Sequence, residues 1–349
     1  MTRARIVVPV LALVLAIALS LIGCSSTPEV VAGWPAAEEE RAVPKPVEPL
    51  RWPLTGLDAP SGEAIEKRVV SVKIENSPTA RPQSGLQQAD VVYETLSEGG
   101  ISRFNVLFHS QSPDPIGPVR SARLSDTTVV PQYGALFVFS GASASVNSAV
   151  RRAGLENLSQ DAGVSAPYYR SRQRSAPHNL YLHLEEARAE AVRRGMSESV
   201  DPKPLAFDGS TPPAGDGQAV TEIDIPFSKA NRVVWRYDEQ AGGYLRWNNG
   251  SVHVDELTGE QLTARNVVVV WARYIPQSRD KAGSTTYDIE LAGSGRMSLF
   301  RDGVRFDGTW EASASAPPVF KTADGVQVKL APGNTWFQVI PTDVNISMQ

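Results

Sequence analysis

The stretch from residue 89 to residue 109, ADVVYETLSEGGISRFNVLFH, carries the clearest indication of the fold. It holds two runs rich in β-branched and aromatic residues, 89–95 and 102–109, with Ser, Glu and Gly between them. Runs of this kind, bounded by turn-forming residues, are typical of β-strands. The stretch therefore predicts two strands early in the folded part of the chain.

Similar signals continue on both sides of this stretch. Strands are predicted at residues 68–74 and 135–139, and helices at residues 121–130, 145–153 and 183–194. The last two helices end in basic residues followed by Gly, the usual signal for a helix end. Strands interleaved with helices indicate an α/β sandwich domain over residues 54–205.

The pattern changes after a segment rich in Pro, Gly and Asp, which is predicted to be a linker at residues 206–220. Strand signals then follow without a convincing amphipathic helix, and Asp302-Gly303 is a typical hairpin turn. The predicted strands are 232–237, 244–247, 267–274, 285–291, 296–300, 304–306, 326–330 and 335–340. Residues 221–349 are therefore predicted to form a smaller, mainly antiparallel β domain, and the fold class is α+β.

The N-terminus predicts export and lipidation. Arg3 and Arg5 precede an apolar run at residues 6–22, as in a secretory signal peptide covering residues 1–23. An uncleaved membrane helix is the alternative, because about 20 apolar residues span a bilayer. The run ends in Leu-Ile-Gly-Cys, the lipobox pattern of bacterial lipoproteins, and Cys24 is the chain's single cysteine. We therefore expect cleavage before Cys24 and a lipid anchor there, with acyl chains such as palmitate in the bilayer.

Residues 24–53, rich in Pro and Glu, are predicted to be a semi-rigid tether. Its proline residues remove backbone donors and favour an extended chain. The expected location is the extracytoplasmic face of the cell membrane.

Composition excludes several classes of function. The 349 residues include 34 Lys and Arg against 38 Asp and Glu, a net charge of −4, which gives no electrostatic footprint for nucleic acid. One cysteine excludes an internal disulfide and a cysteine-cluster zinc site, and the four histidines are too dispersed for a metal motif. No metal and no cofactor is predicted.

The densest polar signal predicts an anion site. Arg103, Arg120, Ser121 and Arg123 lie near Gly-Gly and Gly-Pro turns, and residues 121–130 are predicted to be helical. Guanidinium groups beside the free N–H groups of a first helical turn would bind an anion. In the alternative, the arginines form structural salt bridges with the acidic side chains of Glu94, Glu98 and Asp126.

Catalytic candidates are weaker. Glu94, Glu98, His109 and His178 are the side chains that are suited to general acid–base chemistry. His178 follows a basic stretch, and the unperturbed pKa of histidine lies near neutrality. Arg103 and His109 are an even number of residues apart and should share one strand face. The five tryptophans of the second half are candidates for a carbohydrate platform or for core packing: Trp235, Trp247, Trp271, Trp310 and Trp336.

Several of these motifs together resemble the YerB-like family of bacterial lipoproteins, a two-part domain of unknown function numbered 3048. They are PLTG at 53–56, ARPQSGL at 80–86, QADVVYE at 88–94, EGGISRF at 98–104, IGPVRSAR at 116–123, GSG at 293–295 and DGVRFDGTW at 302–310. The resemblance implies an envelope anchor and assigns no catalytic residue. One departure is residues 139–142, FSGA, where a His-Ala-Gly-Gly-like segment is expected.

Taken together, these features predict a lipid-anchored envelope protein. The first hypothesis is a non-catalytic module that binds an anionic or glycan ligand of the cell wall, or a protein partner. The alternative is an envelope hydrolase or transferase that acts on a phosphate-bearing polymer. An enzyme would need Glu98 and the three arginines to converge in one open pocket.

Overall fold

The computed structural model describes residues 49–210, 217–279 and 283–349. The predicted signal peptide, Cys24 and most of the predicted tether lie outside these residues, as does the middle of the predicted linker. Among the described residues, no helix has the length and apolar character needed to cross a membrane.

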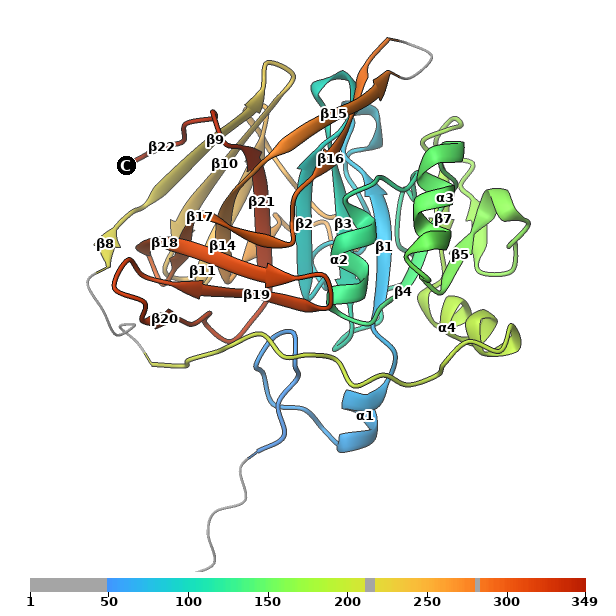
Figure 1. The fold of residues 1–349 in the computed structure, drawn as a ribbon, viewed down its shortest axis with the longest axis horizontal. Helices are drawn as coiled ribbons and strands as arrows, with labels where there is room; N and C mark the ends of the chain where they lie inside the picture. The colour runs from blue at the N-terminus through green and yellow to red at the C-terminus, as the bar shows by residue number, and fades with distance from the viewer. Residues whose placement is uncertain (1–48, 211–216, 280–282) are drawn as a thin grey trace, which may run out of the picture. The chain divides into compact units, whose positions relative to one another are not determined.

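Strands from both halves of the chain join one twelve-stranded mixed sheet (Figure 1). Its centre is β1 (Val70–Glu75), β3 (Ser102–Phe108) and β2 (Val91–Leu96), which pair antiparallel in that order. β2 then pairs parallel with β21 (Thr335–Pro341) from the end of the chain. The N-terminal and C-terminal halves therefore share a backbone hydrogen-bond ladder.

The sheet extends outward from this centre in both directions. On the N-terminal side β1 continues to β4 (Leu136–Phe139) and β5 (Asn157–Ser159), both parallel. On the other side β21 continues through five strands, and β8 (Gln218–Ala219) pairs with one of them, β18. These five are β14 (Asn266–Ala272), β17 (Gly293–Arg301), β18 (Val304–Ser313), β19 (Ala316–Lys321) and β20 (Gln327–Val328).

A second sheet of six strands packs on one face of the C-terminal half, because Trp235 and Ile223 share a buried core with Val267 and Trp336. Two further pairs of strands are small separate sheets. The second sheet contains β9 (Glu222–Ser228), β10 (Asn231–Asp238), β11 (Gly243–Asn248), β12 (Ser251–Val252), β13 (Thr263–Ala264) and β22 (Ser347–Met348). The small sheets are β6 (Tyr168–Arg170) with β7 (Leu180–Leu182), and β15 (Tyr274–Arg279) with β16 (Thr285–Ile289).

Helices cover both faces of the N-terminal half, as in an α/β sandwich. α2 (Asp126–Gln132) and α3 (Ala144–Arg152) contribute side chains to the core on one face, and α4 (Leu184–Arg193) contributes to the core on the other. The short α1 (Gly62–Glu66) precedes β1. Three 3₁₀ turns complete the described helical elements, at Pro78–Ala80, Glu98–Gly100 and Gln160–Ala162.

The predicted α+β class and most predicted elements are confirmed, including the β17–β18 hairpin at Asp302-Gly303. The helix predicted at residues 121–130 is wrong in its start, because α2 begins at Asp126. The residues just before it hydrogen-bond to other parts of the sheet region: Arg120 N donates to Lys73 O and Ala122 N to Gly141 O. These hydrogen bonds tie the segment to β1 and to the loop after β4, so it cannot form the first turn of a helix.

The boundary between the predicted domains, 54–205 and 221–349, stays a prediction. The described residues of the two regions share the large sheet, and they belong to one compact unit. That unit also includes Trp52, a buried side chain in the last residues of the predicted tether.

Candidate functional site

The candidate site is built on β1, along which apolar and polar residues alternate strictly. Val70, Val72 and Ile74 face one core, so the intervening Ser71, Lys73 and Glu75 face the opposite side of the sheet. On the neighbouring β3, Arg103 and Asn105 face the same side, because Glu75 is paired with Arg103 and Lys73 with Asn105. Polar side chains of two central strands thus form a continuous strip, here called the polar strip: Ser71, Lys73, Glu75, Arg103 and Asn105.

The middle of the polar strip forms a buried ion pair with the first residue of α2. Lys73 Nζ donates to Asp126 Oδ1 at 2.6 Å, and Asn105 Nδ2 donates to the same oxygen at 3.0 Å. Burial lowers the pKa of Lys73, and the attraction of Asp126 opposes this shift. The other oxygen, Asp126 Oδ2, accepts from Arg123 N at 2.6 Å. The pair therefore fixes the segment that carries the predicted anion site.

At its outer end the strip meets the three predicted arginines. Arg123 Nε donates to Glu98 Oε2 at 2.9 Å, and Arg103 Nη2 lies 3.8 Å from the same oxygen. Arg120 pairs with Glu75, with Nε and Oε2 3.1 Å apart. We call this group the arginine cluster: Arg103, Arg120, Arg123, Glu75 and Glu98. Both carboxylates are shared, because Glu98 meets two arginines and Glu75 meets one arginine and a histidine.

That histidine is His178. Its Nδ1 lies 2.9 Å from Glu75 Oε2, and Ser77 Oγ donates to Glu75 Oε1 at 2.9 Å. The imidazole side chain is 27% exposed, whereas Glu75 is buried. Thr79 Oγ1 lies 3.4 Å from Nε2 and 3.5 Å from Nδ1, so this hydroxyl favours neither nitrogen. A buried carboxylate thus orients a partly exposed imidazole at the edge of the arginine cluster.

The arginine cluster and the neighbouring Lys73–Asp126 pair together carry more positive charge than their carboxylates balance. Lys73 and the three arginines give four cations, against three carboxylates from Glu75, Glu98 and Asp126. Arg103 shows the imbalance most clearly. It is 8% exposed, its Nη1 donates only to Ser121 O at 3.2 Å, and its Nε has no hydrogen-bond partner among the described residues.

The pKa shifts follow from this crowding. Burial lowers the pKa of Arg103 to about 9, and repulsion from Arg123 adds to the shift while Glu98 opposes it. Burial also raises the pKa of Glu98, but Arg123 and Arg103 more than offset this and lower it to about 2. Glu98 is therefore a fixed negative charge at neutral pH, and Arg103 is a cation that lacks full compensation.

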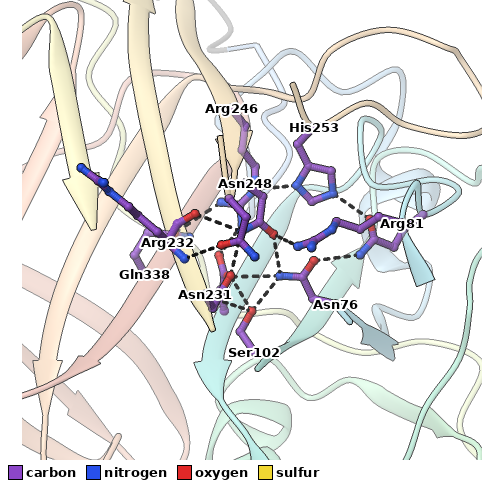
Figure 2. Close-up of polar contacts among 12 residues, drawn as sticks. Asn76, Arg81, Ser102, Asn231, Arg232, Arg246, Asn248, His253 and Gln338 are labelled. Carbon is purple, nitrogen blue, oxygen red and sulfur yellow. Dashed lines mark hydrogen bonds and ion pairs between the residues drawn. The ribbon is translucent and has the colours of Figure 1, made fainter. Parts of the chain in front are cut away.

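A second polar group lies on the opposite face of the same strand ends, because Glu94 is paired with Phe104 and not with Arg103. Figure 2 shows its polar contacts. We call it the buried network. Its centre is the ion pair between Arg246 Nη2 and Glu94 Oε2, 2.7 Å long and with both side chains 0% exposed. Ser102 Oγ donates to the other Glu94 oxygen at 2.6 Å. The remaining members are Asn76, Arg81, Gln83, Asn231, Asn248, His253 and Gln338.

Aromatic rings enclose Arg246. Its guanidinium carbon lies 5.0 Å from the ring centre of Trp235 and 4.8 Å from that of Trp336. Arg246 Nε donates to His253 Nδ1 at 2.9 Å, so the Nε2–H of His253 donates to Gln83 Oε1 at 2.7 Å. Burial, Arg246 and Arg81 lower the pKa of His253 well below its usual value, and the ring stays neutral. The network joins β1, β2 and β3 to the second sheet.

The structure thus brings some predicted site residues together and separates others. Glu98 and His178 belong to the arginine cluster or touch it, whereas Glu94 lies on the opposite face with Arg246. His109 is at the far end of β3, where its Nε2 lies 2.8 Å from Ile65 O. Burial lowers its pKa to about 4, opposed by that hydrogen bond. Arg103 and His109, which were predicted to share one strand face, therefore belong to different environments.

Ser121 contributes its backbone rather than a helix terminus. Its carbonyl oxygen accepts from Arg103 and from Arg123, each at 3.2 Å. Within the described part of the chain, no group of three His, Cys, Asp or Glu side chains is arranged to hold a metal ion.

Sequence reasoning missed Lys73, Glu75 and Arg246. The first two had a readable signal, because VSVKIE at residues 70–75 alternates apolar and polar residues. Arg246 had none, since its burial depends on Glu94, 152 residues away in the sequence.

Comparison with known proteins supports one family. Residues 54–197 match the model described as "Protein of unknown function (DUF3048) N-terminal domain", and residues 223–337 match its C-terminal domain. The chain is 30% identical over 308 residues to "Putative lipoprotein YerB" of Bacillus subtilis (strain 168), covering 88% of this chain and 91% of that protein. It is also similar to the crystal structure of YerB protein from Bacillus subtilis, with a TM-score of 0.76 and 30% identity over 85% of this chain and 99% of that one.

Proposed function

The chain belongs to the DUF3048 family, and on this premise we propose that it is a lipid-anchored envelope protein that binds an anionic ligand without catalysis. The observation that carries the proposal is Arg103, a nearly buried guanidinium with one nitrogen unpartnered and an incompletely balanced charge. Burying an incompletely compensated charge is costly, and a bound anion would supply the missing partner.

The anchor is proposed at Cys24. The lipobox at residues 21–24 supports it, as does the name of the Bacillus subtilis relative, a lipoprotein. Replacing Cys24 with Ala should leave an unprocessed precursor that lacks lipid, detected as a larger species on a gel. Normal processing of C24A would refute the lipobox assignment.

The ligand class follows from the donors. Guanidinium groups bind carboxylate and phosphate oxygens with two parallel hydrogen bonds, so three arginines favour an anion with several oxygens. At the outer face of the membrane, phosphate-bearing polymers and acidic cell-wall glycans are anions of this kind. A protein partner would engage the cluster through the same groups, on Asp, Glu or a phosphorylated side chain.

Thermal unfolding of the detergent-solubilised protein in phosphate, sulfate and glucuronate tests this proposal. A ligand that binds only the folded state raises the midpoint with its concentration. Arg123→Ala should abolish the rise, and Arg123→Lys should reduce it, since Lys keeps the charge but loses the bidentate geometry. Arg232→Ala is the control, because Arg232 is an exposed arginine that pairs with Asp224. This variant should respond like the wild type. An equal rise in R123A, or no rise with any anion in the wild type, would reject the arginine cluster as the site.

A second candidate, an envelope hydrolase acting on a phosphate-bearing polymer, is favoured by the contact between Glu75 and His178. The ion pairs of the cluster count against it, because Glu98 is paired with Arg103 and Arg123, and Arg120 with Glu75, rather than free to act on a substrate. A carboxylate that orients an imidazole beside guanidinium groups is suited to activating water as a general base. Hydrolysis of bis(p-nitrophenyl) phosphate by the wild type, lost in His178→Gln but kept in Arg232→Ala, would support it. Anion binding without hydrolysis would reject the hydrolase and support the binding function.

A further inference from the structure

Two adjoining cavities lie at one end of β14 and β17, outside the arginine cluster. Their volumes are about 430 and 400 Å³, and the walls of both include Trp271 and Arg296. Each volume falls in the range of small-molecule sites, roughly 300–1,000 Å³. The shared side chains make Trp271 and Arg296 the partition between two parts of one groove.

The indole of Trp271 is held in a fixed orientation. Its Nε1 donates to Val344 O at 2.8 Å, and its own carbonyl oxygen accepts from Trp310 Nε1 at 3.3 Å. Gly295 allows this close packing, because a Cβ there would lie 2.7 Å from Trp310 Nε1 and 2.8 Å from Trp271 O. The groove therefore has a rigid aromatic wall that exists before any ligand binds.

Arg296 is the unusual charge of this groove. Its side chain is exposed, and its guanidinium carbon lies 3.8 Å from the ring centre of Trp271. Among the described residues it forms no ion pair, whereas Arg305 in the same walls pairs with Asp307 and Arg273 lies 3.9 Å from Glu290. With the other charges paired, the groove carries one uncompensated positive charge, and that charge lies directly over an indole face.

The rest of the lining is suited to hydroxyl groups. Ser294 and Thr342 line the first cavity, and Asn345 lines the second. An apolar ligand, or a flat aromatic anion, would stack on the indole but leave these donors and acceptors unpaired. A sugar ring presents apolar C–H groups on one face and hydroxyls around its edge, and so satisfies both parts of the lining.

We propose that this groove binds an acidic saccharide, with a sugar ring over Trp271 and the acid group on Arg296. The ring takes the place that the guanidinium holds in the free protein, and the guanidinium turns to pair with the carboxylate. The exchange replaces the cation–π contact between Arg296 and Trp271 with a charge-assisted hydrogen bond and with stacking of the sugar ring. This second site does not depend on the arginine cluster.

Calorimetric titration of the full-length protein in detergent tests the proposal, with N-acetylmuramic acid as probe and N-acetylglucosamine as the matched sugar without a carboxylate. We expect the wild type to bind the acidic sugar at least tenfold more tightly. Arg296→Ala should remove that preference while keeping the weaker binding of the neutral sugar, and Arg296→Lys should keep part of it. Arg236→Ala is the matched control, because Arg236 also stacks on an indole, 4.6 Å from the ring centre of Trp247, and lines neither cavity.

Three results would overturn the proposal. The first is equal affinity of the wild type for the two sugars, and the second is no binding of either at millimolar concentration. The third is unchanged binding of N-acetylmuramic acid by R296A, which would place the acid group away from Arg296. If R123A then lost this binding, the acid group would lie at the arginine cluster. Trp271→Phe adds an independent readout, because a smaller ring should weaken both sugars, and circular dichroism checks that this variant is folded.

Discussion

Replacing Glu94 with Gln is the sharpest test of the buried network. Glu94 and Arg246 are both 0% exposed and 2.7 Å apart, and Gln keeps the shape of the side chain while removing its charge. Arg246 would then retain only neutral partners, His253 Nδ1 at 2.9 Å and Gln338 Oε1 at 3.4 Å, together with the surrounding rings. The variant therefore isolates the cost of a buried guanidinium without a counter-ion.

The expected loss is about 3–5 kcal/mol of unfolding free energy, the cost of breaking a buried ion pair from one side. Since each 1.4 kcal/mol is a factor of ten, the unfolding equilibrium should shift by roughly a hundredfold to several thousandfold. The double variant E94Q/R246M should recover part of the loss, because Met removes the unpaired charge and fills much of the same volume.

Urea unfolding followed by tryptophan fluorescence and by circular dichroism measures these differences. Glu311→Gln is the control, since Glu311 pairs with Lys321 at 2.6 Å on the surface and should cost about 1 kcal/mol or less. The reasoning is refuted if E94Q costs no more than E311Q, or if the double variant is as unstable as the sum of its single changes.

Three further predictions concern pH and packing. The folded pKa of Glu98, about 2, lies below its usual 4.5, so the stability that its charge contributes is present above pH 4.5 and is lost as pH falls toward 2. In urea unfolding measured across this pH range, E98Q should lose less unfolding free energy than the wild type. An equal loss in both proteins would contradict this. The folded pKa of His109, about 4, lies below its usual 6.5, so the folded state loses stability as pH falls from 6.5 to 4. H109Q should remove the part of this pH dependence that comes from His109. An unchanged pH dependence in H109Q would assign it to another group. A Cβ at Gly308 would meet the Lys321 backbone oxygen at 1.9 Å, so G308A should cost about 1–3 kcal/mol in thermal unfolding, whereas G62A, with nothing within 4 Å, should not destabilise the protein.

Much of the fold could be predicted from the sequence because its strands are marked by local composition. The runs at 89–95 and 102–109 are β2 and β3, and Asp302-Gly303 closes the β17–β18 hairpin. The parallel pairing of β2 with β21 was not predictable, because it joins residues more than 240 positions apart by backbone hydrogen bonds that leave no local signal. The helix start at residue 121 was misjudged for a related reason: hydrogen bonds from Arg120 to β1 and from Ala122 to Gly141 override the local propensity.

The candidate site was predictable to a smaller extent. The three arginines and Glu98 stand close together in the sequence as charges near turns, and the structure brings them together. Nearness in the sequence predicts that Glu94 belongs with them. On a strand, however, residues an odd number apart face opposite sides, and Glu94 is on the side of Phe104, not of Arg103. The strand parity of these side chains, rather than their spacing, determines which of them can share a site.

The same parity explains why the arginine cluster and the buried network lie back to back. Glu75 belongs to the cluster and the next residue, Asn76, to the network, and Gln83 Nε2 donates to both, to Glu75 O at 2.7 Å and to Asn76 Oδ1 at 3.1 Å. Arg103 and Ser102 are related in the same way on β3. A binding group keeps its geometry only when the element that carries it is fixed from behind. The buried network fixes these two strand ends, and so it holds the partly balanced guanidinium of Arg103 in place where a mobile segment would let it turn to water.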